Sequence, residues 1–265
     1  MSRRIAGAVR VAVVLAALGA LSGCGTRGEV TSLAQLEGKV FAVPTGTVAD
    51  TLVLSRFPKA KFQYFNSVLD CAMAVKAGKA DAAAYDEPIL RNLAAKNEGL
   101  TVLPEMITVD QYGFAVRPDD AELKAAIDAV VAGLKADGGY EEMKGRWLPK
   151  SGPPAPMPQL PPGGESGVLR LGTAAVTEPF SFVDASRNVV GLDVELAQHV
   201  ARRLGRRLEV VDMDFGAMIP ALLSGKVDVI AACITITEER AKSVLFSEPY
   251  YAGGIAALVR EAKRP

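Results

Sequence analysis

The sequence predicts an α/β fold in which helices cover mainly parallel sheets. Apolar, strand-like stretches alternate with helix-like stretches along most of the chain, as expected for parallel strands buried under helices. Apolar residues make up 49% of the 265 residues, which is enough for a substantial core. The segments 74–84 ("AVKAGKADAAA") and 221–231 ("ALLSGKVDVIA") also echo each other: each ends a helix at a Gly-Lys turn and leads into a strand. Two related lobes would produce this echo, and so would convergent turn chemistry.

The first half of the chain contains five predicted strands and the helices between them. Ser67 is expected to cap the second helix, with Asp70 completing a capping-box pattern. A long amphipathic helix is predicted within 120–139, where apolar residues fall at helical spacing and Gly138-Gly139 stops the pattern. A last short helix carries Trp147, the single tryptophan. The strands are predicted at 39–43, 61–65, 80–85, 100–104 and 112–118, and the first and third helices end near Arg56 and Asn97.

The second half repeats the alternation of strand and helix. It begins with a strand at 168–173 and a hairpin at 180–191. A helix is then expected from Asp193 to Leu204. The remaining predicted elements are a strand at 207–212, a helix at 217–225, a strand at 227–233, a helix near 237–244 and a closing segment at 254–261.

A proline-rich segment separates the two halves. It has six prolines between Pro153 and Pro162, followed by two glycines. Proline lacks the N–H donor and fixes φ, so this segment is excluded from helices and central strands. Proline-rich spacers are extended and semi-rigid, and a Gly-Gly pair adds a flexible joint. We therefore predict a linker at 151–167.

The amino terminus has the composition of an export signal. Arg3, Arg4 and Arg10 accompany an apolar run at 11–21, which is about half the ~20 residues that a bilayer span needs. The run ends in "LSGC", which resembles the lipobox of bacterial lipoproteins, where the cysteine becomes the lipidated first residue. The sequence thus predicts cleavage before Cys24 and lipidation of Cys24. An ordinary signal peptide with an incidental cysteine is the alternative.

Composition and motifs disfavour several classes of function. Thirty basic residues balance thirty acidic ones, and no basic patch is interleaved with aromatic residues, so nucleic-acid binding is not expected. His199 is the single histidine, which excludes a Ser/His/Asp triad and a multi-histidine metal site. The chain has no CxxC, GxGxxG or Walker motif, so we predict no cofactor, no metal and no enzymatic activity. Cys71 and Cys233 lie in apolar surroundings and are expected to be buried free thiols.

Five stretches resemble one known family, the periplasmic amino-acid-binding proteins of bacterial ABC importers (extracellular solute-binding proteins, family 3). The most specific is "SGKVDVIAACITITEERAKSVLFSEPYY" at 224–251, which is similar to the family's signature stretch. The segment 169–205 resembles the family's amino-terminal opening. The segments 31–47 and 80–88 resemble its second lobe, and 112–148 contains blocks that resemble its carboxyl end. The resemblance implies a two-lobed, periplasmic-binding-protein-like (type II) α/β fold.

The order of these stretches differs from the family's, because the second half of the family pattern precedes the first half here. We therefore expect a circular permutation, in which the linker joins the family's usual carboxyl end to its usual amino end. Residues 111–114 are expected to form the one surviving covalent crossing between the lobes, with a looser hinge as the consequence. The predicted segments are a signal peptide at 1–23, a lipidated tether at 24–30, the second lobe at 31–109, the carboxyl part of the first lobe at 110–150, the linker at 151–167 and the amino part of the first lobe at 168–265.

The resemblance also implies a ligand site. A free amino acid presents a carboxylate and an ammonium group on one carbon, so its pocket needs a fork-shaped donor and an acceptor. Arg240 is expected to bind the carboxylate, because a guanidinium binds it bidentately and stays charged. Asp86, at the end of an apolar strand, is expected to bind the ammonium group, although it could also cap the following helix. The other predicted ligand-binding residues are Thr235, Cys233, Phe215, Thr47, Thr177, Tyr85 and Gly46.

Two departures from the family pattern bear on specificity. Thr177 stands where the family often has a second aromatic residue, so half of the usual aromatic sandwich is missing. Ala174, Pro44 and Val48 stand where binders of charged ligands often have polar groups. We therefore expect a small or neutral polar amino acid, with Tyr85 and Glu178 able to reach its side chain.

The function expected from this resemblance is capture of an amino acid between two lobes and its delivery to an ABC permease. The protein would act outside the cytoplasm and be held to the cell membrane by the lipid on Cys24. Two alternatives stay open. One is a ligand-sensing or partner-docking lobe without transport. The other is an enzyme resembling cyclohexadienyl dehydratase, for which Glu178 would be the general acid.

Overall fold

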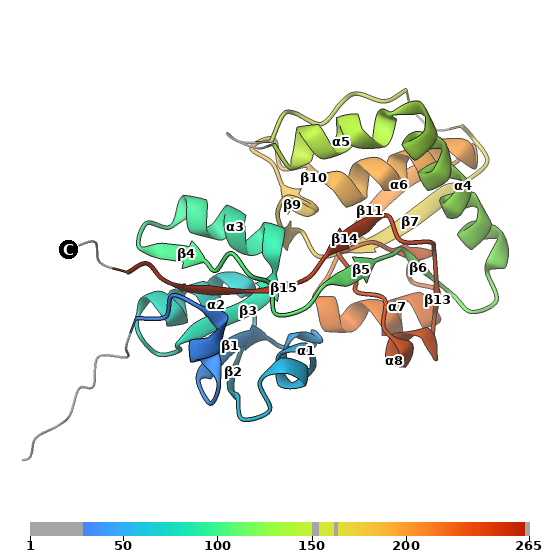
Figure 1. The fold of residues 1–265 in the computed structure, drawn as a ribbon. Coiled ribbons are helices and arrows are strands. Elements are labelled where there is room, and N and C mark those ends of the chain that lie inside the picture. The colour runs from blue at the N-terminus through green and yellow to red at the C-terminus, as the bar shows by residue number, and fades with distance from the viewer. Residues whose placement is uncertain (1–28, 150–153, 162–163, 263–265) are drawn as a thin grey trace, which may run out of the picture.

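The computed structural model describes residues 29–149, 154–161 and 164–262. It consists of two α/β lobes joined by a pair of crossing segments (Figure 1). Each lobe is built on a five-stranded sheet with helices packed on it, so the predicted two-lobed α/β fold is confirmed. Cys24 and the signal-like segment lie outside the described residues. Within the described residues, no helix is both long enough and apolar enough to cross a membrane.

The second lobe contains both ends of the described chain, which emerge on the same side in Figure 1. Its sheet has the strand order β2-β1-β3-β15-β4, in which β1 pairs in parallel with β2 and β3 while β15 runs antiparallel to its neighbours. Its strands are β1 (Val40–Pro44), β2 (Lys61–Phe65), β3 (Ala82–Asp86), β4 (Leu100–Val102) and β15 (Ile255–Arg260). Its helices are η1 (Leu33–Leu36), α1 (Ala49–Arg56), α2 (Val68–Lys76) and α3 (Glu87–Lys96).

The first lobe has the equivalent strand order, β11-β7-β12-β6-β13. Its antiparallel strand is β6, which pairs with β12 and β13. Its main strands are β6 (Ala115–Val116), β7 (Val168–Thr173), β11 (Arg207–Asp212), β12 (Val229–Ile230) and β13 (Leu245–Phe246). A small sheet is added by β8 (Val176–Thr177), β9 (Ser181–Val183) and β10 (Val189–Val190). The helices are α4 (Ala121–Asp137), α5 (Gly139–Trp147), α6 (Leu192–Arg203), η2 (Phe215–Ala217), α7 (Met218–Leu223) and α8 (Glu238–Ala241).

Each sheet receives its antiparallel strand from the opposite half of the chain. The expectation that 168–265 lies wholly in the first lobe is wrong for β15, which inserts between β3 and β4 of the second lobe. Its residues are fully apolar and buried from Ile255 to Val259, so their burial in that sheet is strongly favoured. The strand therefore belongs to the lobe that provides its apolar neighbours.

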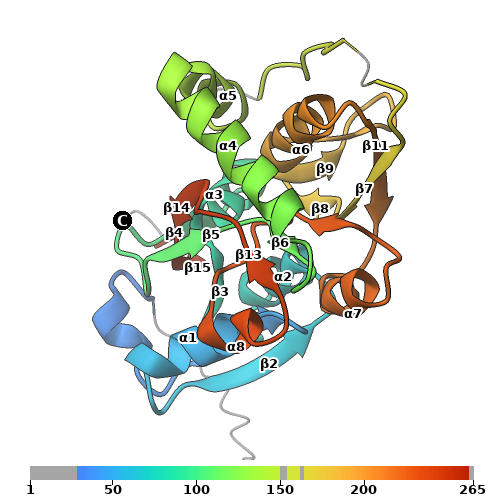
Figure 2. The same ribbon diagram turned by 90° about the vertical axis from the view of Figure 1, so that its right-hand side faces the viewer.

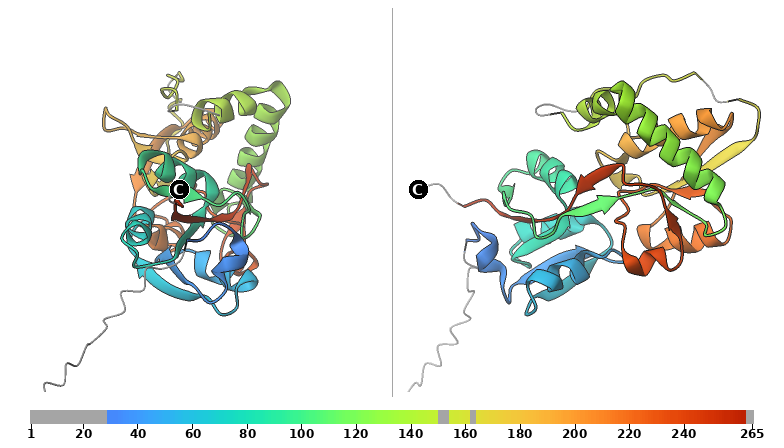
Figure 3. Two further views of the ribbon diagram at one scale, coloured as in Figure 1. Left: turned by 60° about the vertical axis from the view of Figure 1, so that its left-hand side comes forward. Right: turned by 45° about the vertical axis from the view of Figure 1, so that its right-hand side comes forward.

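The two lobes are joined by two crossings, which corrects the expectation of a single one at 111–114. β5 (Asp110–Tyr112) leads into the first lobe and β14 (Tyr251–Gly253) leads out of it, and the two strands pair antiparallel. The rings of Tyr112 and Tyr251 stack with centroids 5.6 Å apart. The right-hand view of Figure 3 shows this ribbon running between the lobes. The hinge is thus a pair of hydrogen-bonded strands with two stacked tyrosine rings.

Local sequence signals account for several boundaries. The Ser67 hydroxyl accepts a hydrogen bond from the Asp70 backbone N–H, as the predicted cap requires. Helix α4 is capped at its start by Asp120, whose side chain accepts from the Leu123 N–H, and at its end by Gly138, which has φ of 88°. A left-handed residue at a helix end favours glycine, because glycine has no Cβ to clash.

The described part of the linker lies against the first lobe, where it passes over α6 on its way from α5 to β7 (Figure 2). The Ala155 N–H donates to the Arg146 carbonyl at 3.1 Å, and Met157 packs on the main apolar core. That core also contains Trp147, whose indole N–H donates to Glu195. The described part of the linker thus lies on the surface of the first lobe, and the linker connects two elements of that lobe.

Candidate ligand-binding site

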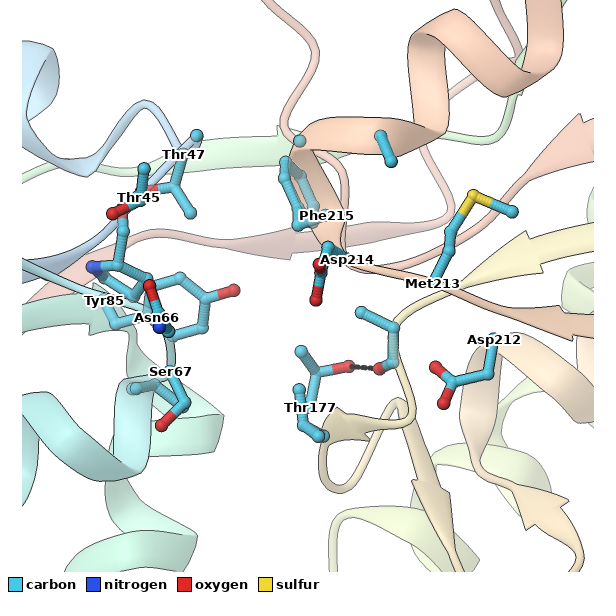
Figure 4. Close-up of a pocket in the computed structure, with 17 residues that line it drawn as sticks. Thr45, Thr47, Asn66, Ser67, Tyr85, Thr177, Asp212, Met213, Asp214 and Phe215 are labelled. Atoms are coloured by element: carbon cyan, nitrogen blue, oxygen red, sulfur yellow. Dashed lines mark hydrogen bonds between the residues drawn. The ribbon is translucent and has the colours of Figure 1, made fainter.

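A cavity of about 870 Å³ opens between the two lobes (Figure 4). The second lobe contributes the loops after β1 and β2 and the end of β3. The first lobe contributes the loop after β7 and the segment from the end of β11 through η2. All of these lie at or just beyond the carboxyl ends of strands, which is where open α/β sheets bind ligands.

A second, much smaller void of about 10 Å³ adjoins the first. It shares Thr47, Tyr85 and Phe215 with the larger cavity and reaches the Arg240 side chain. The structure brings all nine predicted ligand-binding residues to these two spaces. The larger cavity is lined by Gly46 and Thr177, the smaller one by Asp86, Cys233, Thr235 and Arg240, and both by Thr47, Tyr85 and Phe215.

Arg240 is held in place without a carboxylate partner. Its guanidinium donates to the Thr235 carbonyl at 3.0 Å and lies 5.2 Å from the centroid of the Phe215 ring. In the described part of the chain, no carboxylate lies within ion-pair distance of it. Burial lowers the pKa of Arg240 from its ordinary value, while Asp86 acts in the opposite direction. The site therefore presents a half-buried cation that an anionic group can satisfy.

Asp86 is the acidic counterpart from the other lobe. It ends β3, is buried, and accepts a hydrogen bond from the Tyr112 hydroxyl. Burial raises its pKa from 3.8 to about 7, although the bond from Tyr112 opposes the shift. Asp86 makes no capping bond to α3, so the alternative role as a helix cap is not seen. A bound ammonium group would favour its charged form.

Hydrogen bonds with buried residues hold the loop that contains Cys233 and Thr235. Cys233 has φ of 48°, and its N–H donates to Asp193 at 2.9 Å. Asp193 is itself buried and accepts from the Tyr250 hydroxyl at 2.6 Å. Burial raises its pKa to about 7. Thr235 forms a bridge with Tyr112 of the hinge ribbon. The loop next to Arg240 is thus tied to the crossing segments.

The backbones of the two lobes approach each other closely at the glycine of the loop after β1. Gly46 has φ of 79°, and a Cβ there would lie 3.2 Å from the Cα of Gly216 in the other lobe. Thr47 donates its hydroxyl to the Pro44 carbonyl at 2.9 Å, and Thr177 donates to the Ala174 carbonyl at 3.0 Å. Glycine at position 46 permits both the positive φ and this close approach.

Two carboxylates in the cavity wall were not predicted. Asp212 and Asp214 flank Met213 just where β11 leads into η2, and both line the larger cavity (Figure 4). The Ala175 N–H donates to Asp212 at 2.8 Å. The same signal that identified Asp86, an aspartate at the end of an apolar strand, would have identified Asp212.

Glu178 lies outside both spaces, contrary to the expectation that it could reach a ligand. It forms an ion pair with Lys96 of the other lobe and lines a surface groove beside the linker. Cys71 and Cys233 are both buried free thiols, as expected. Burial raises the pKa of Cys71 to about 12, so its thiol stays protonated.

Comparison with known proteins divides the chain into two matched parts. Residues 169–265 match the bacterial extracellular solute-binding proteins, family 3. Over this segment the chain is similar to the members of that family. Residues 24–148 match the periplasmic substrate-binding proteins of ABC transporters for phosphonate. Neither match includes 149–168, which contains the proline-rich linker.

Curated proteins that resemble part of this chain are named as amino-acid binders. The arginine-binding extracellular protein ArtP of Bacillus subtilis is 46% identical over 91 residues, covering 34% of this chain and 35% of that protein. The L-cystine-binding protein TcyJ of Escherichia coli is 36% identical over 97 residues, covering 37% and 36%. The matched segments thus span about a third of the relatives' length. Among solved structures, holo ArgBP from T. maritima is 54% identical, covers 32% of this chain and 38% of that one, and has a TM-score of 0.32.

The family-3 segment contains Arg240, Thr235, Cys233 and Phe215, while Asp86 lies in the segment matched to the phosphonate binders. The family is one of solute-binding proteins. Within the described residues, no group of three or more His, Cys, Asp or Glu side chains is arranged to hold a metal ion.

Proposed function

We propose that this protein captures a free amino acid between its two lobes and delivers it to an ABC permease. The observation that carries this proposal is the pairing of Arg240 from one lobe with Asp86 from the other at a single small void. An amino acid has one carboxylate and one ammonium group on the same carbon. Bound there, it would bridge the lobes and compensate both buried charges.

The geometry supports closure around the ligand. The chain crosses between the lobes in the paired strands β5 and β14, next to the site. Binding energy from both lobes would favour the closed form over the open one. Closing would also exclude water and so strengthen the contacts of Arg240 and Asp86 with the ligand.

An amino acid fits the site better than a phosphonate does, although the second lobe matches the phosphonate binders. A phosphonate would place negative charge near the Asp86 carboxyl group, which already has a raised pKa because of its burial. An ammonium group reverses that penalty. The charge of Asp86 therefore favours a zwitterionic ligand.

The ligand's side chain is a separate question. Thr177 and Ala174 leave room and no aromatic ring on one wall of the larger cavity, which underlies the expectation of a small or neutral polar amino acid. The relatives named above are binders of arginine and of L-cystine, so both charged and uncharged side chains occur among them. Specificity must come from the cavity's own residues.

Delivery to a permease and anchoring by lipid on Cys24 are further parts of the proposal. The family match and the relatives' names support an extracytoplasmic location. The lipobox-like "LSGC" supports the anchor. An ordinary cleaved signal peptide would instead release the protein, and labelling with a radioactive fatty acid distinguishes the two because only the lipoprotein incorporates it.

We also propose that the chain is a circular permutation of the family pattern. The family-3 match lies in the carboxyl-terminal part of the chain, and the segment 149–168, which neither family matches, joins α5 to β7 within one lobe. The strand orders of the two sheets are equivalent, each with an antiparallel strand from the other half. A linker that closes the family's original termini accounts for these features together.

The alternatives are less well supported. The dehydratase reading needs a general acid in the cleft, and Glu178 is paired with Lys96 away from it. A partner-docking module that has lost its ligand would have little reason to keep Arg240 half-buried without an anionic partner. Failure to bind any amino acid would nevertheless favour that module.

The test is a thermal-shift screen of the twenty amino acids against the purified protein and its Arg240→Ala variant. A ligand present at a hundredfold over its Kd adds about 2.7 kcal/mol to the free energy of unfolding, which raises the Tm clearly. We expect one chemical group of amino acids to stabilise the wild type and not the variant. Arg117→Ala is the matched control, because Arg117 lies in the first lobe away from both cavities. If no amino acid stabilises the wild type, the proposed function is refuted.

A further inference from the structure

We propose that the larger cavity is a subsite for a cationic side chain and that Asp212 and Asp214 determine this specificity, together with Tyr85. The inference rests on the proposed function and deepens it, because it names the class of amino acid that the cleft selects. It also departs from the expectation of a small or neutral ligand, which considered only the residues at positions where the family pattern is usually polar.

The charge of the cavity wall is one-sided. Among the described residues that line the larger cavity are Asp212 and Asp214 but no lysine, arginine or histidine. Neither aspartate forms an ion pair with any described residue. Carboxylates that face a partly enclosed space without a cation raise the local negative potential, so a positively charged group there is favoured.

Asp212 is positioned by the sheet. It ends β11, in register with Thr173 of β7, and one of its oxygens accepts from the Ala175 N–H at 2.8 Å. This bond fixes the carboxylate beside Ala174, which also lines the cavity. The family resemblance leads one to expect a polar residue at position 174, where this chain has the methyl group of alanine. The Asp212 carboxylate, from the neighbouring strand, lies next to that position. The second Asp212 oxygen has no hydrogen-bond donor among the described residues.

Asp214 is held by backbone but its side chain is unengaged. It precedes η2 and makes no side-chain capping bond to it. In Figure 4 its carboxylate projects into the space between Phe215 and Thr177. The adjacent Phe215 ring faces the Arg240 guanidinium on one side, so the same short segment borders both the carboxylate-binding end and the acidic end of the site.

Tyr85 is an independent indication of a ligand. The residue is 6% exposed, yet its hydroxyl points into the cavity from the opposite lobe and has no hydrogen-bond partner among the described residues (Figure 4). The residue as a whole is buried, but its unpaired hydroxyl opens onto the cavity, where a polar group of a ligand can bind it. Burial also raises the pKa of Tyr85 well above its usual value, which keeps the hydroxyl neutral and able to accept a bond from a cation.

A guanidinium or ammonium group in this space would have acceptors on two sides. Tyr85 lies on the second lobe, and the two aspartates lie on the first. A cationic side chain would therefore also bridge the lobes, at the end of the ligand opposite to Arg240 and Asp86. A neutral side chain of the same shape would gain no charge-assisted contact with the two carboxylates, which are exposed to water without a ligand.

The experiment is calorimetric titration of the purified protein with L-arginine, L-lysine and L-citrulline, which is the uncharged isostere of arginine. We expect arginine or lysine to bind at least about tenfold more tightly than citrulline, because a charge-assisted hydrogen bond is worth more than its neutral counterpart. Asp214→Asn and Asp212→Asn should each reduce that ratio several-fold, and the double variant should bring it close to one. Tyr85→Phe should weaken the binding of the cationic ligand and leave the protein folded, because the ring is retained.

Glu209→Gln is the matched control, since Glu209 lies on the same strand as Asp212, is exposed and lines neither cavity. It removes the same charge and should leave the ratio unchanged. Equal binding of arginine and citrulline, or a ratio that survives the double variant, overturns this inference while the proposed function stands. If the wild type, folded by circular dichroism, binds no amino acid at all, both are overturned.

Discussion

Two buried carboxyl groups, Asp86 in the second lobe and Asp193 in the first, each accept a hydrogen bond from a tyrosine hydroxyl. Tyr112 donates to Asp86, and Tyr250 donates to Asp193. The first faces the smaller void, whereas the second holds the Cys233 backbone N–H and lines neither ligand space. Similar burial thus serves a proposed ligand contact in one case and the shape of a loop in the other.

Asp86→Asn should stabilise the ligand-free protein increasingly as pH rises. Burial raises the pKa of Asp86 from 3.8 to about 7, so between about pH 4 and 7 the folded state retains a proton that the unfolded state has lost. The free-energy contribution of this carboxyl group to stability therefore falls as pH rises through that window. Thermal unfolding from pH 4 to 8 should show the variant gaining on the wild type as pH increases. A difference that is constant with pH would contradict the shifted pKa.

The same variant should lose amino-acid binding, because an amide cannot compensate an ammonium charge. Asp193→Asn is the matched control: its pKa is also raised to about 7 by burial, so it should show the same trend in stability. Binding should be retained if its loop keeps its shape. In the wild type, affinity should increase as pH rises through about 7, because the ligand requires the charged form of Asp86.

The nine ligand-binding residues that were predicted from the sequence all line the two spaces, because the family resemblance fixed their positions in long stretches. Asp212 has the same strand-end signal as Asp86, but its position beside Ala174 does not follow from the sequence of its own strand. Asp212 ends β11 and Ala174 follows β7, so the position of the Asp212 carboxylate beside Ala174 depends on the pairing of these two strands. A prediction made one sequence position at a time does not include which residues become neighbours through strand pairing.

At the scale of elements, the hinge ribbon departs most from expectation. The segment 112–118 was predicted as one strand, but the chain divides it between β5 in the ribbon and β6 in the first-lobe sheet. Periodicity detects an extended segment and does not tell which lobe it pairs with. Strand β14, which leads back to the second lobe, was not predicted either. It is three residues long, and it forms a strand only through its pairing with β5.

Gly254→Ala should destabilise the protein strongly. Gly254 joins β14 to β15, and a Cβ there would lie 2.0 Å from the Thr108 carbonyl oxygen, so the backbone would have to shift at the hinge. We expect a loss of at least about 2 kcal/mol in the free energy of unfolding, measured by denaturant titration. Gly133→Ala is the control, because Gly133 lies in α4 with no atom within 4 Å of its Cβ position. That change should stabilise by roughly 0.5–1 kcal/mol, and equal effects of the two would refute the steric argument.

At the scale of the whole molecule, the lobes are interlaced, because each sheet is completed by a strand from the other half of the chain. The predicted fold class did not depend on this arrangement, whereas the predicted domain limits did, and they placed β15 in the wrong lobe. Local patterns determine strands and helices, but the sheet that β15 joins is decided by where it can pair on both sides, with β3 and β4, among apolar neighbours.

Interlacing predicts that the two halves cannot fold alone. Chains of residues 29–163 and 164–265 are separated within the linker, which joins elements of one lobe and contributes little to either sheet. The first fragment lacks β15, whose five apolar residues from Ile255 to Val259 are buried between β3 and β4. The second lacks β6 and the helices α4 and α5, which pack on its sheet and on α6. Each fragment alone should therefore lose the cooperative thermal transition.

Mixing the fragments should restore that transition. Only one peptide bond, within the linker, is missing from the mixture, and all the strands that pair with one another are present. The intact chain with a protease site in the linker provides the control, since cutting after folding should leave a single transition at nearly the same Tm. Near-ultraviolet circular dichroism of Trp147, which is buried against Glu195 across the two fragments, reports reassembly directly. If either fragment alone shows a cooperative transition of its own, the lobes are independent units and the interlaced sheets do not determine how the molecule folds.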